Sequence, residues 1–208
     1  MTPGRFISLE GGEGAGKSTQ ASRLAAHLDT LGLHCVVTRE PGGSEGAEAV
    51  RGLLLGGEVT RWSAHSETLL FAAARADHVE KRIRPALQSG GWVICDRFVD
   101  STRAYQGAQG IDDAAILALH GFGSKGLLPD RTLVLEIDHG EGANRAAARD
   151  KGALDRFGAR GPEFHAAVAD AFRTIAAREP DRVRVIDAAA DPDTVTARLI
   201  AGIADLLP

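Results

Sequence analysis

The segment GGEGAGKST, at residues 11–19, constrains the fold of this chain more than any other feature of the sequence. It directly follows a strand-like run at 5–10 (RFISLE) and leads into a helical pattern at about 17–31. The segment matches G-x-x-x-x-G-K-[ST], where glycines let backbone N–H groups turn inward around phosphate oxygens without a Cβ clash. A strand, a tight loop and a helix N-terminus must therefore follow one another. The sequence predicts a phosphate-binding loop within an α/β fold.

The side chains of this loop suit a nucleoside triphosphate with magnesium. We expect Lys17 to place its charge on the β- and γ-phosphates, and the Ser18 hydroxyl to ligate Mg²⁺. The helix N-terminus behind Thr19 adds a favourable dipole. The alternative is a glycine-rich turn that happens to contain a lysine. From the residue frequencies of the chain, a chance match to the pattern is expected about 0.005 times. The residues expected to bind ATP are Gly11, Gly12, Glu13, Gly14, Ala15, Gly16, Lys17, Ser18 and Thr19.

Strand-like and helical segments alternate along the whole chain. The strand-like runs are short, rich in Val and Ile and almost continuously apolar, as in a parallel sheet buried on both faces; they lie at 5–10, 34–39, 92–96, 131–137 and 182–187. Helical patterns lie at about 17–31, 45–55, 64–90, 112–122, 140–149, 162–178 and 192–206. The segment 64–90 forms one helix or two, because Pro85 stands where a helix kinks or restarts. With the phosphate-binding loop, this order predicts a three-layer P-loop NTPase sandwich with a five-stranded parallel sheet flanked by helices.

Composition argues against several other classes of protein. A net charge of −4 over 208 residues gives no sequence-wide basic field, so we expect no nucleic-acid partner. No apolar run approaches the ~20 residues of a membrane span, and the N-terminus lacks a signal-peptide pattern. Cys35 and Cys95 both lie in apolar runs, which favours buried thiols in a reducing compartment over a disulfide or a metal site. These observations predict a cytoplasmic protein without a membrane partner.

Polar segments follow three of the predicted strands. The phosphate-binding loop follows the first, TREPGG (38–43) the second and DRF (96–98) the third. Ligands of doubly wound sheets bind beyond the carboxyl ends of the strands, where the strand order reverses. If the second and third strands lie on the same side of the first, these segments converge on one crevice. Their mixture of carboxylates and arginines suits two phosphorylated ligands and a metal; the residues are Glu13, Glu40, Asp96, Arg39, Arg75 and Arg97.

Five segments together resemble thymidylate kinase (dTMP kinase), particularly the bacterial type. They are EGGEGAGKST, TREPGG, LLFAAARADH, DRFVDSTRAYQG and LDRF, and the resemblance runs in order from residue 5 to about 200. It implies a single nucleoside monophosphate kinase domain over residues 1–208, with a lid at about 145–158. It also implies transfer of the ATP γ-phosphate to dTMP, giving dTDP and ADP in dTTP biosynthesis, with Mg²⁺. A homodimer is implied too, with the helices around 64–90 as a candidate interface.

The resemblance also implies roles for individual residues on the acceptor side. Phe71 matches the aromatic residue that stacks on thymine, although LLFAAA also suits a core phenylalanine. Arg75, one helical turn further on, matches the arginine at the thymine O4 side, and Arg97 the arginine that contacts the acceptor phosphate. Asp96 is expected to order Mg²⁺-bound water; the alternative is that it caps the strand end. The expected metal-site residues are Ser18 and Asp96. The expected substrate-binding set is Glu40, Pro41, Arg51, Phe71, Arg75, Arg97, Thr102, Tyr105 and Gln106.

For two of these residues, the resemblance implies a specific contact with the sugar or the phosphate of the substrate. Tyr105 would crowd a ribose 2′-hydroxyl and so favour deoxynucleotides. Arg51 is expected to contact the acceptor phosphate, with an exposed helix arginine as the alternative.

A basic segment, NRAAARDKGALDRFG, supplies the predicted lid. Arg145 and Arg149 are four residues apart and share a helical face. A mobile basic flap can close over the transferring phosphoryl group, add positive charge and exclude water. We expect Lys17, Arg97, Arg149 and Arg156 to be catalytic. The choice among Arg149, Lys151 and Arg156 for the γ-phosphate stays open, because Gly158 stands where an acid often follows DRF; a solvated charged helix end is the alternative.

Two rival functions remain at this point. One is a kinase for another nucleoside monophosphate, and the other is a weakly active ATP-binding regulatory protein. A GTPase switch is disfavoured because the chain has no convincing N-K-x-D-type guanine motif. The presence of both acceptor and lid residues argues against the regulatory protein.

Overall fold

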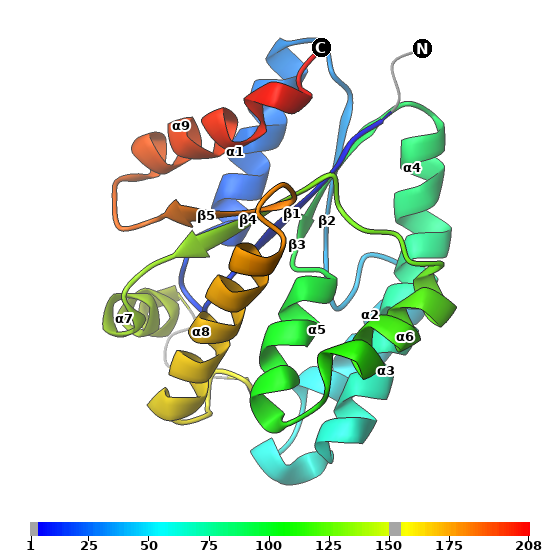
Figure 1. Cartoon of the computed structure of the whole chain (residues 1–208), viewed down its shortest axis with the longest axis vertical. Helices are drawn as coiled ribbons and strands as arrows, with labels where there is room; N and C mark the ends of the chain where they lie inside the picture. The colour runs from blue at the N-terminus through cyan, green and yellow to red at the C-terminus, as the bar shows by residue number, and fades with distance from the viewer. Residues whose placement is uncertain (1–3, 150–154) are drawn as a thin grey trace.

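A computed structural model of the protein describes residues 4–149 and 155–208, and a parallel five-stranded sheet forms its centre (Figure 1). The order across the sheet is β2-β3-β1-β4-β5, and every neighbouring pair is parallel. Each predicted strand lies within one residue of the observed strand at both ends, so the predicted architecture is confirmed. The strands are β1 (Phe6–Gly11), β2 (Cys35–Arg39), β3 (Trp92–Asp96), β4 (Arg131–Glu136) and β5 (Val183–Asp187).

Helices form at each predicted segment, and one further helix, α5, forms where only a polar segment was expected. Seven residues are too few to show a helical period in the sequence, yet most residues of α5 are buried against the sheet. No helix in the described part of the chain is long and apolar enough to cross a membrane. The helices are α1 (Lys17–Thr30), α2 (Glu45–Leu55), α3 (Ala64–His78), α4 (Arg84–Gln88), α5 (Val99–Tyr105), α6 (Asp113–Ser124), α7 (His139–Arg149), α8 (Pro162–Arg178) and α9 (Pro192–Ile203).

The central strand β1 has one apolar face and one mixed face. Ile7 and Leu9 belong to an apolar cluster that includes residues of α1 and α9, which lie side by side over this face of the sheet (Figure 1). Phe6 packs on the opposite face, edge to face with Phe98. Because side chains alternate along a strand, Ser8 and Glu10 share the face of Phe6. All of β1 is buried, so this second face carries polar groups into the interior beneath α5.

Within the predicted segment 64–90, residues 64–88 form one continuous helical rod with a change of pitch. α3 runs into a π-helical turn at Val79–Ile83, which runs into α4. The N–H of Arg84 donates to the carbonyl of Val79, five residues earlier. Pro85 follows directly, in the first turn of α4. A proline lacks an N–H and its ring clashes with the carbonyl four residues earlier in a regular helix, and the widened turn accommodates it without ending the rod.

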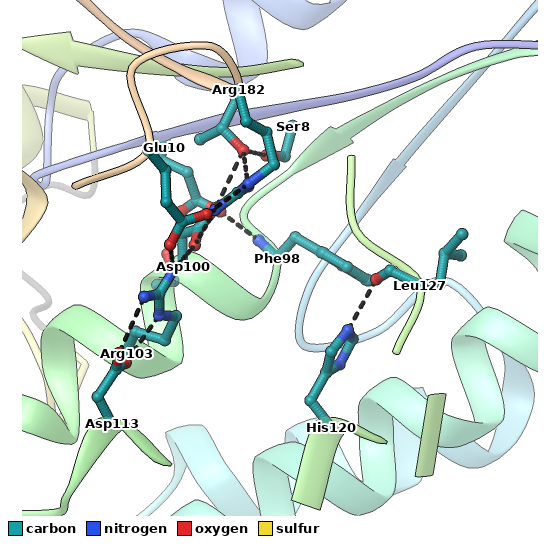
Figure 2. Close-up of polar contacts among 12 residues, drawn as sticks. Ser8, Glu10, Phe98, Asp100, Arg103, Asp113, His120, Leu127 and Arg182 are labelled. Atoms are coloured by element: carbon teal, nitrogen blue, oxygen red, sulfur yellow. Dashed lines mark hydrogen bonds and ion pairs between the residues drawn. The ribbon is translucent and has the colours of Figure 1, made fainter. Parts of the chain in front are cut away.

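A buried cluster of charges fixes α5 against the sheet (Figure 2). Asp100 of α5 is fully buried. Its carboxylate accepts hydrogen bonds from Arg182 at 2.7 Å, from Arg103 at 3.0 Å and from the Thr132 hydroxyl of β4 at 3.0 Å. Arg103 also donates to Asp113 of α6 at 2.7 Å. One carboxylate therefore ties α5 to β4 and to the chain entering β5, and through Arg103 to α6.

We predict that Asp100→Ala lowers the free energy of unfolding by about 3–5 kcal/mol, because the change leaves buried guanidinium groups without their carboxylate. Urea denaturation followed by circular dichroism measures it. The matched control is Asp170→Ala, which removes an exposed carboxylate that pairs with Arg173 on the same helix and should change stability by less than about 1 kcal/mol. If both substitutions changed the free energy of unfolding equally, the buried cluster would not be the source of the stabilisation.

Candidate active site

One cavity of about 520 Å³ opens at the carboxyl edge of the sheet. Because β3 and β2 follow one another on the same side of β1, the segments after β1, β2 and β3 meet there. The cavity combines the phosphate-binding loop with aromatic, basic and acidic side chains. Its lining is Glu13, Gly14, Gly16, Lys17, Ser18, Thr19, Arg39, Glu40, Pro41, Arg51, Leu55, Phe71, Arg75, Asp96, Arg97, Phe98, Ser101, Thr102, Tyr105, Gln106, Arg145, Asp155 and Phe157.

The phosphate-binding loop has the backbone that its glycines allow. Gly11, Gly14 and Gly16 have positive φ angles, and a Cβ at Gly11 would lie 2.3 Å from the carbonyl oxygen of Leu135. Lys17 is buried and its ammonium donates to the carbonyls of Gly12 at 2.6 Å and Gly11 at 3.2 Å. Burial, and then the nearby Arg97 charge, lower the pKa of Lys17 to about 8. The loop therefore holds a partly desolvated cation, ready for an anionic ligand.

Two side-chain oxygens suited to a cation lie side by side, from Ser18 in the first turn of α1 and Asp96 at the end of β3. The Ser18 hydroxyl donates to Asp96 Oδ2 at 2.5 Å. Among the described residues, no group of three or more His, Cys, Asp or Glu side chains could hold a metal. Mg²⁺ is commonly held by one or two protein oxygens together with waters and substrate phosphates. The Ser18–Asp96 pair beside the phosphate-binding loop has the chemistry for that kind of site.

Arg97 lies between the phosphate-binding loop and α5. Its Nη1 donates to the Gly11 carbonyl at 3.0 Å and to Ser101 Oγ at 3.1 Å, and its Nη2 donates to the Tyr105 hydroxyl at 3.2 Å. Its guanidinium carbon lies 5.0 Å from the centre of the Tyr105 ring, and Glu13 is 3.5 Å from Nη2. The backbone of Arg97 has φ of +70°, which is uncommon outside glycine. A strained turn thus aims this guanidinium along the cavity wall.

At the other end of the cavity, Arg75 is buried in a network with Glu40. Arg75 Nε donates to Glu40 Oε2 at 2.7 Å, and its Nη2 donates to the Thr102 hydroxyl at 2.7 Å. His78 contacts the other oxygen of Glu40 at 3.1 Å and Thr38 Oγ1 at 2.7 Å. Because Arg75 and Glu40 are both almost completely buried, their arrangement is set by the fold before any ligand enters. Arg75 is therefore not a solvated surface arginine.

Three further predicted residues complete this end. Phe71 is half-buried, and its ring lies 5.7 Å from that of Phe157, so it borders both the core and the cavity. Arg51 donates to the carbonyl of Pro41 at 2.6 Å and also lines the cavity. The peptide bond between Glu40 and Pro41 is cis. Because Phe71 borders both the core and the cavity, it can pack in the core and also offer a ring face to a ligand.

Gln106 has an unused acceptor inside the cavity wall. Its side-chain nitrogen donates to Glu67 Oε1 at 2.9 Å, which fixes the orientation of the amide. The amide oxygen is buried and has no hydrogen-bond partner among the described residues. Buried acceptors without a partner are uncommon and call for an explanation. A hydrogen-bond donor on a bound ligand would satisfy it.

The predicted lid residues are distributed between two places. Arg145 of α7 lines the cavity and pairs with Glu141. The backbone of Arg149 ends α7, but its side chain and the whole of Lys151 lie outside the described residues. Arg156 does not line the cavity; its guanidinium is buried. It donates to Glu67 Oε2 at 2.9 Å and to three backbone carbonyls, those of Leu54, Glu58 and Val59.

Several lining residues were not singled out from the sequence. Ser101 lies inside the DRFVDSTRAYQG segment, and its spacing of four from Arg97 was the available signal. Leu55 and Phe157 come from separate segments that meet only in the folded chain. Glu10, beneath the cavity, carried a signal as well, since an acid inside a buried strand calls for a partner.

The thymidylate kinase family profile matches residues 9–199. The chain belongs to the thymidylate kinase family. A thymidylate kinase of Rhizorhabdus wittichii is 60% identical over 207 residues, covering 99% of this chain and 100% of that protein. A thymidylate kinase of Caulobacter vibrioides is 52% identical, covering 96% of this chain and 95% of that protein. The crystal structure of thymidylate kinase from Ehrlichia chaffeensis superposes with a TM-score of 0.77 at 35% identity, covering 96% of this chain and 98% of that one.

Membership of the thymidylate kinase family confirms the resemblance that the motifs indicated. It favours an enzyme that phosphorylates dTMP over a regulatory protein that only holds ATP. The fold it implies is also the fold observed.

We predict that Arg156→Met lowers the free energy of unfolding by about 3–5 kcal/mol, because Glu67 loses a buried guanidinium partner and three carbonyls lose their donor. Arg145→Met, in the same lid but with a half-exposed ion pair, should change it by less than about 1 kcal/mol. Urea titration monitored by tryptophan fluorescence measures both. Equal stability of the two variants would contradict an anchoring role for Arg156.

Proposed function

We propose that this chain transfers the γ-phosphoryl group of ATP to dTMP, giving dTDP and ADP. The observation that carries this proposal is the position of Arg97, whose guanidinium contacts both the phosphate-binding loop and α5 within one cavity. A donor phosphate on the loop and an acceptor phosphate at Arg97 would share one positively charged wall. Phosphoryl transfer depends mainly on such positioning and on electrostatic stabilisation of the migrating charge.

On the donor side, the loop N–H groups and Lys17 would hold the β- and γ-phosphates. Bound phosphate would attract the Lys17 ammonium away from the carbonyls of Gly11 and Gly12 that it contacts here. Mg²⁺ would be held by Ser18 directly and by Asp96 through ordered water, and it would neutralise phosphate charge. Lys17 supplies a second positive charge on the migrating phosphoryl group.

On the acceptor side, Arg97 would hold the phosphate of dTMP in line with the donor. A planar guanidinium matches two phosphate oxygens at once, which fixes orientation as well as charge. No strong general base is required, because the attacking oxygen already belongs to an anion. Tyr105, against the Arg97 guanidinium, would lie near C2′ of the sugar and favour deoxyribose, with Glu40 and Pro41 beside the sugar and Arg51 as a further phosphate contact.

Base recognition would use Phe71, Arg75 and Gln106. Phe71 offers a ring face for stacking, and Arg75 donates toward the O4 side of thymine, held there by Glu40 and Thr102. The unpaired Gln106 oxygen would accept the N3–H of thymine. Cytosine carries an acceptor at N3 instead of a donor, so it would leave that oxygen unsatisfied and repelled. Uracil shares the N3–H, so this contact alone does not separate dUMP from dTMP.

The predicted catalytic roles of Arg149 and Arg156 stay predictions. Arg156 would have to leave the Glu67 carboxylate and three carbonyls to reach the γ-phosphate. Arg145, which lines the cavity on α7, is the better placed cation in this conformation. We therefore propose a single domain over residues 1–208 in which a lid at about 145–158 supplies charge from α7, while Arg156 anchors its far end.

We further propose a cytoplasmic homodimer. Two cysteines with free thiols suit a reducing compartment. Exposed apolar side chains on α2, α3 and α6 support an interface there, namely Leu53, Leu69 and Phe122, which is 92% exposed.

Two substitutions test the division of roles in the cavity. Lys17→Ala should lower kcat about 100- to 1000-fold, because a preorganised charge on the migrating phosphoryl group is lost. Arg97→Ala should lower kcat/KM for dTMP about 100-fold or more while the KM for ATP changes less than about 3-fold. A coupled ADP-release assay measures both. Unchanged dTDP formation by Lys17→Ala, or equal loss of ATP and dTMP binding in Arg97→Ala, would refute the mechanism.

A second experiment tests base recognition. Gln106→Met removes the free acceptor while keeping the length of the side chain, and it should raise the KM for dTMP about 5- to 30-fold through one lost hydrogen bond. Gln109→Met is the matched control, because Gln109 also donates to Glu67 Oε1, at 2.7 Å, but does not line the cavity. The panel of substrates is dTMP, dUMP, dCMP, UMP and CMP. Equal effects of the two variants, or dCMP used as well as dTMP, would count against this pose.

A further inference from the structure

Glu10 is a buried acid that the proposed mechanism does not use. It lies near the carboxyl end of β1, directly before the phosphate-binding loop, and is 0% exposed. Figure 2 shows its side chain reaching from β1 toward the backbone of Phe98. A buried carboxyl group costs free energy unless its oxygens are hydrogen-bonded. Glu10 therefore needs either a structural or a functional reason.

The partners of Glu10 are the residues that shape the turn after β3. Its Oε1 accepts the backbone N–H of Phe98 at 2.7 Å, and its Oε2 lies 2.5 Å from the hydroxyl of Ser101. Phe98 directly follows Arg97, whose φ is +70°. Ser101 Oγ in turn accepts a hydrogen bond from Arg97 Nη1 at 3.1 Å. Glu10 thus fixes both the strained backbone beside Arg97 and, through Ser101, its guanidinium.

We propose that Glu10 is a positioning residue that aims Arg97 at the acceptor phosphate, and that it does so as the neutral acid. This proposal rests on the proposed function, because Arg97 is assigned to the acceptor phosphate there. Glu10 itself does not line the cavity, so it acts through Ser101 and the backbone of Phe98.

The surroundings of Glu10 favour its neutral form. Burial, and then the negative charge of Asp100 on α5, raise the pKa of Glu10 to about 8, although Ser101, Arg97 and the Phe98 N–H oppose this shift. The negative charge of Asp100 is itself paired with the guanidinium groups of Arg103 and Arg182. The other titratable groups that interact with Glu10 from neighbouring elements are Lys17, Cys95 and Tyr105.

The protonation state of Glu10 decides how much of the Arg97 charge is available to a ligand. When Glu10 is ionised, the Ser101 hydroxyl must donate to its carboxylate, and the Arg97 guanidinium gains a further internal counter-charge besides Glu13 and Asp96. When Glu10 is neutral, its own O–H can donate to Ser101, and the Arg97 charge remains free for the phosphate. Binding of the dTMP phosphate and ionisation of Glu10 should therefore oppose each other, by linkage.

The test is the KM for dTMP between pH 6.5 and 9.5 at saturating ATP and Mg²⁺. In the wild-type enzyme, we expect this KM to rise as pH passes 8, by about tenfold at pH 9, because only about one tenth of Glu10 is then neutral. Glu10→Gln imitates the neutral acid and should show a flat profile. Glu10→Ala loses both partners and should have a KM raised about 10-fold or more at every pH. Glu136→Gln, at the end of neighbouring β4, should keep the wild-type profile.

This experiment distinguishes the titration of Glu10 from that of other groups with a pKa near 8. Lys17 also has a pKa near 8, but its loss of charge acts on the KM for ATP and on kcat rather than on the KM for dTMP. The proposal is overturned if Glu10→Gln keeps the wild-type rise in KM, or if Glu10→Ala matches Glu10→Gln in KM. If dTMP is not phosphorylated at pH 7 by the wild-type enzyme, the proposed function itself fails instead.

A measurement on the wild-type protein covers the case in which the variants do not fold. The carboxyl carbon of Glu10 can be followed by ¹³C NMR through a pH titration with and without dTMP. We expect a midpoint near 8 in the free protein and a higher midpoint with dTMP bound. A midpoint at the usual value for glutamate, about 4.3, or one that dTMP leaves unchanged, would overturn the proposal.

Discussion

The hydrogen bond from Arg97 to the carbonyl of Gly11 joins the two halves of the cavity. Gly11 begins the phosphate-binding loop, and Arg97 begins the turn into α5, which carries Thr102 and Tyr105. The contact exists because β3 pairs directly with β1 in parallel, so that both strands end at the same edge of the sheet. The proposed donor and acceptor sites are thereby held at a fixed separation, which is what in-line phosphoryl transfer requires.

Three buried acidic side chains support the walls of this cavity from behind. Asp100 fixes α5 against β4 and Arg182, Glu10 fixes the turn at Arg97, and Glu67 ties Gln106 of the wall to Arg156 of the lid segment. Each is 0% exposed and is met by guanidinium, hydroxyl, amide or backbone donors. A buried acidic group, ionised or neutral, costs free energy unless its hydrogen bonds are complete. Their concentration around one cavity is the arrangement expected of a preorganised site.

Much of the site was predictable because its residues belong to short continuous motifs. GGEGAGKST and DRFVDSTRAYQG each place several lining residues within one loop or helix turn, and the five strands were clear from their apolar runs. The helix α5 was missed because seven residues show no period, and its formation depends on burial against the sheet. The engagement of Arg156 with Glu67 was missed for a different reason, since the two residues are far apart in sequence and belong to different segments.

By itself, the sequence determined the phosphate-binding loop and the order of strands and helices, and it predicted residues for the acceptor side. These depend on local chemistry, on periodicity and on motifs read along the chain. Only the tertiary structure decided which neighbours each charged side chain meets. It placed Arg145 at the cavity and Arg156 in the interior, left the oxygen of Gln106 unpaired, and set Glu10 behind Arg97. Those outcomes depend on which strand faces and helix faces come together, and no local pattern in the sequence encodes that.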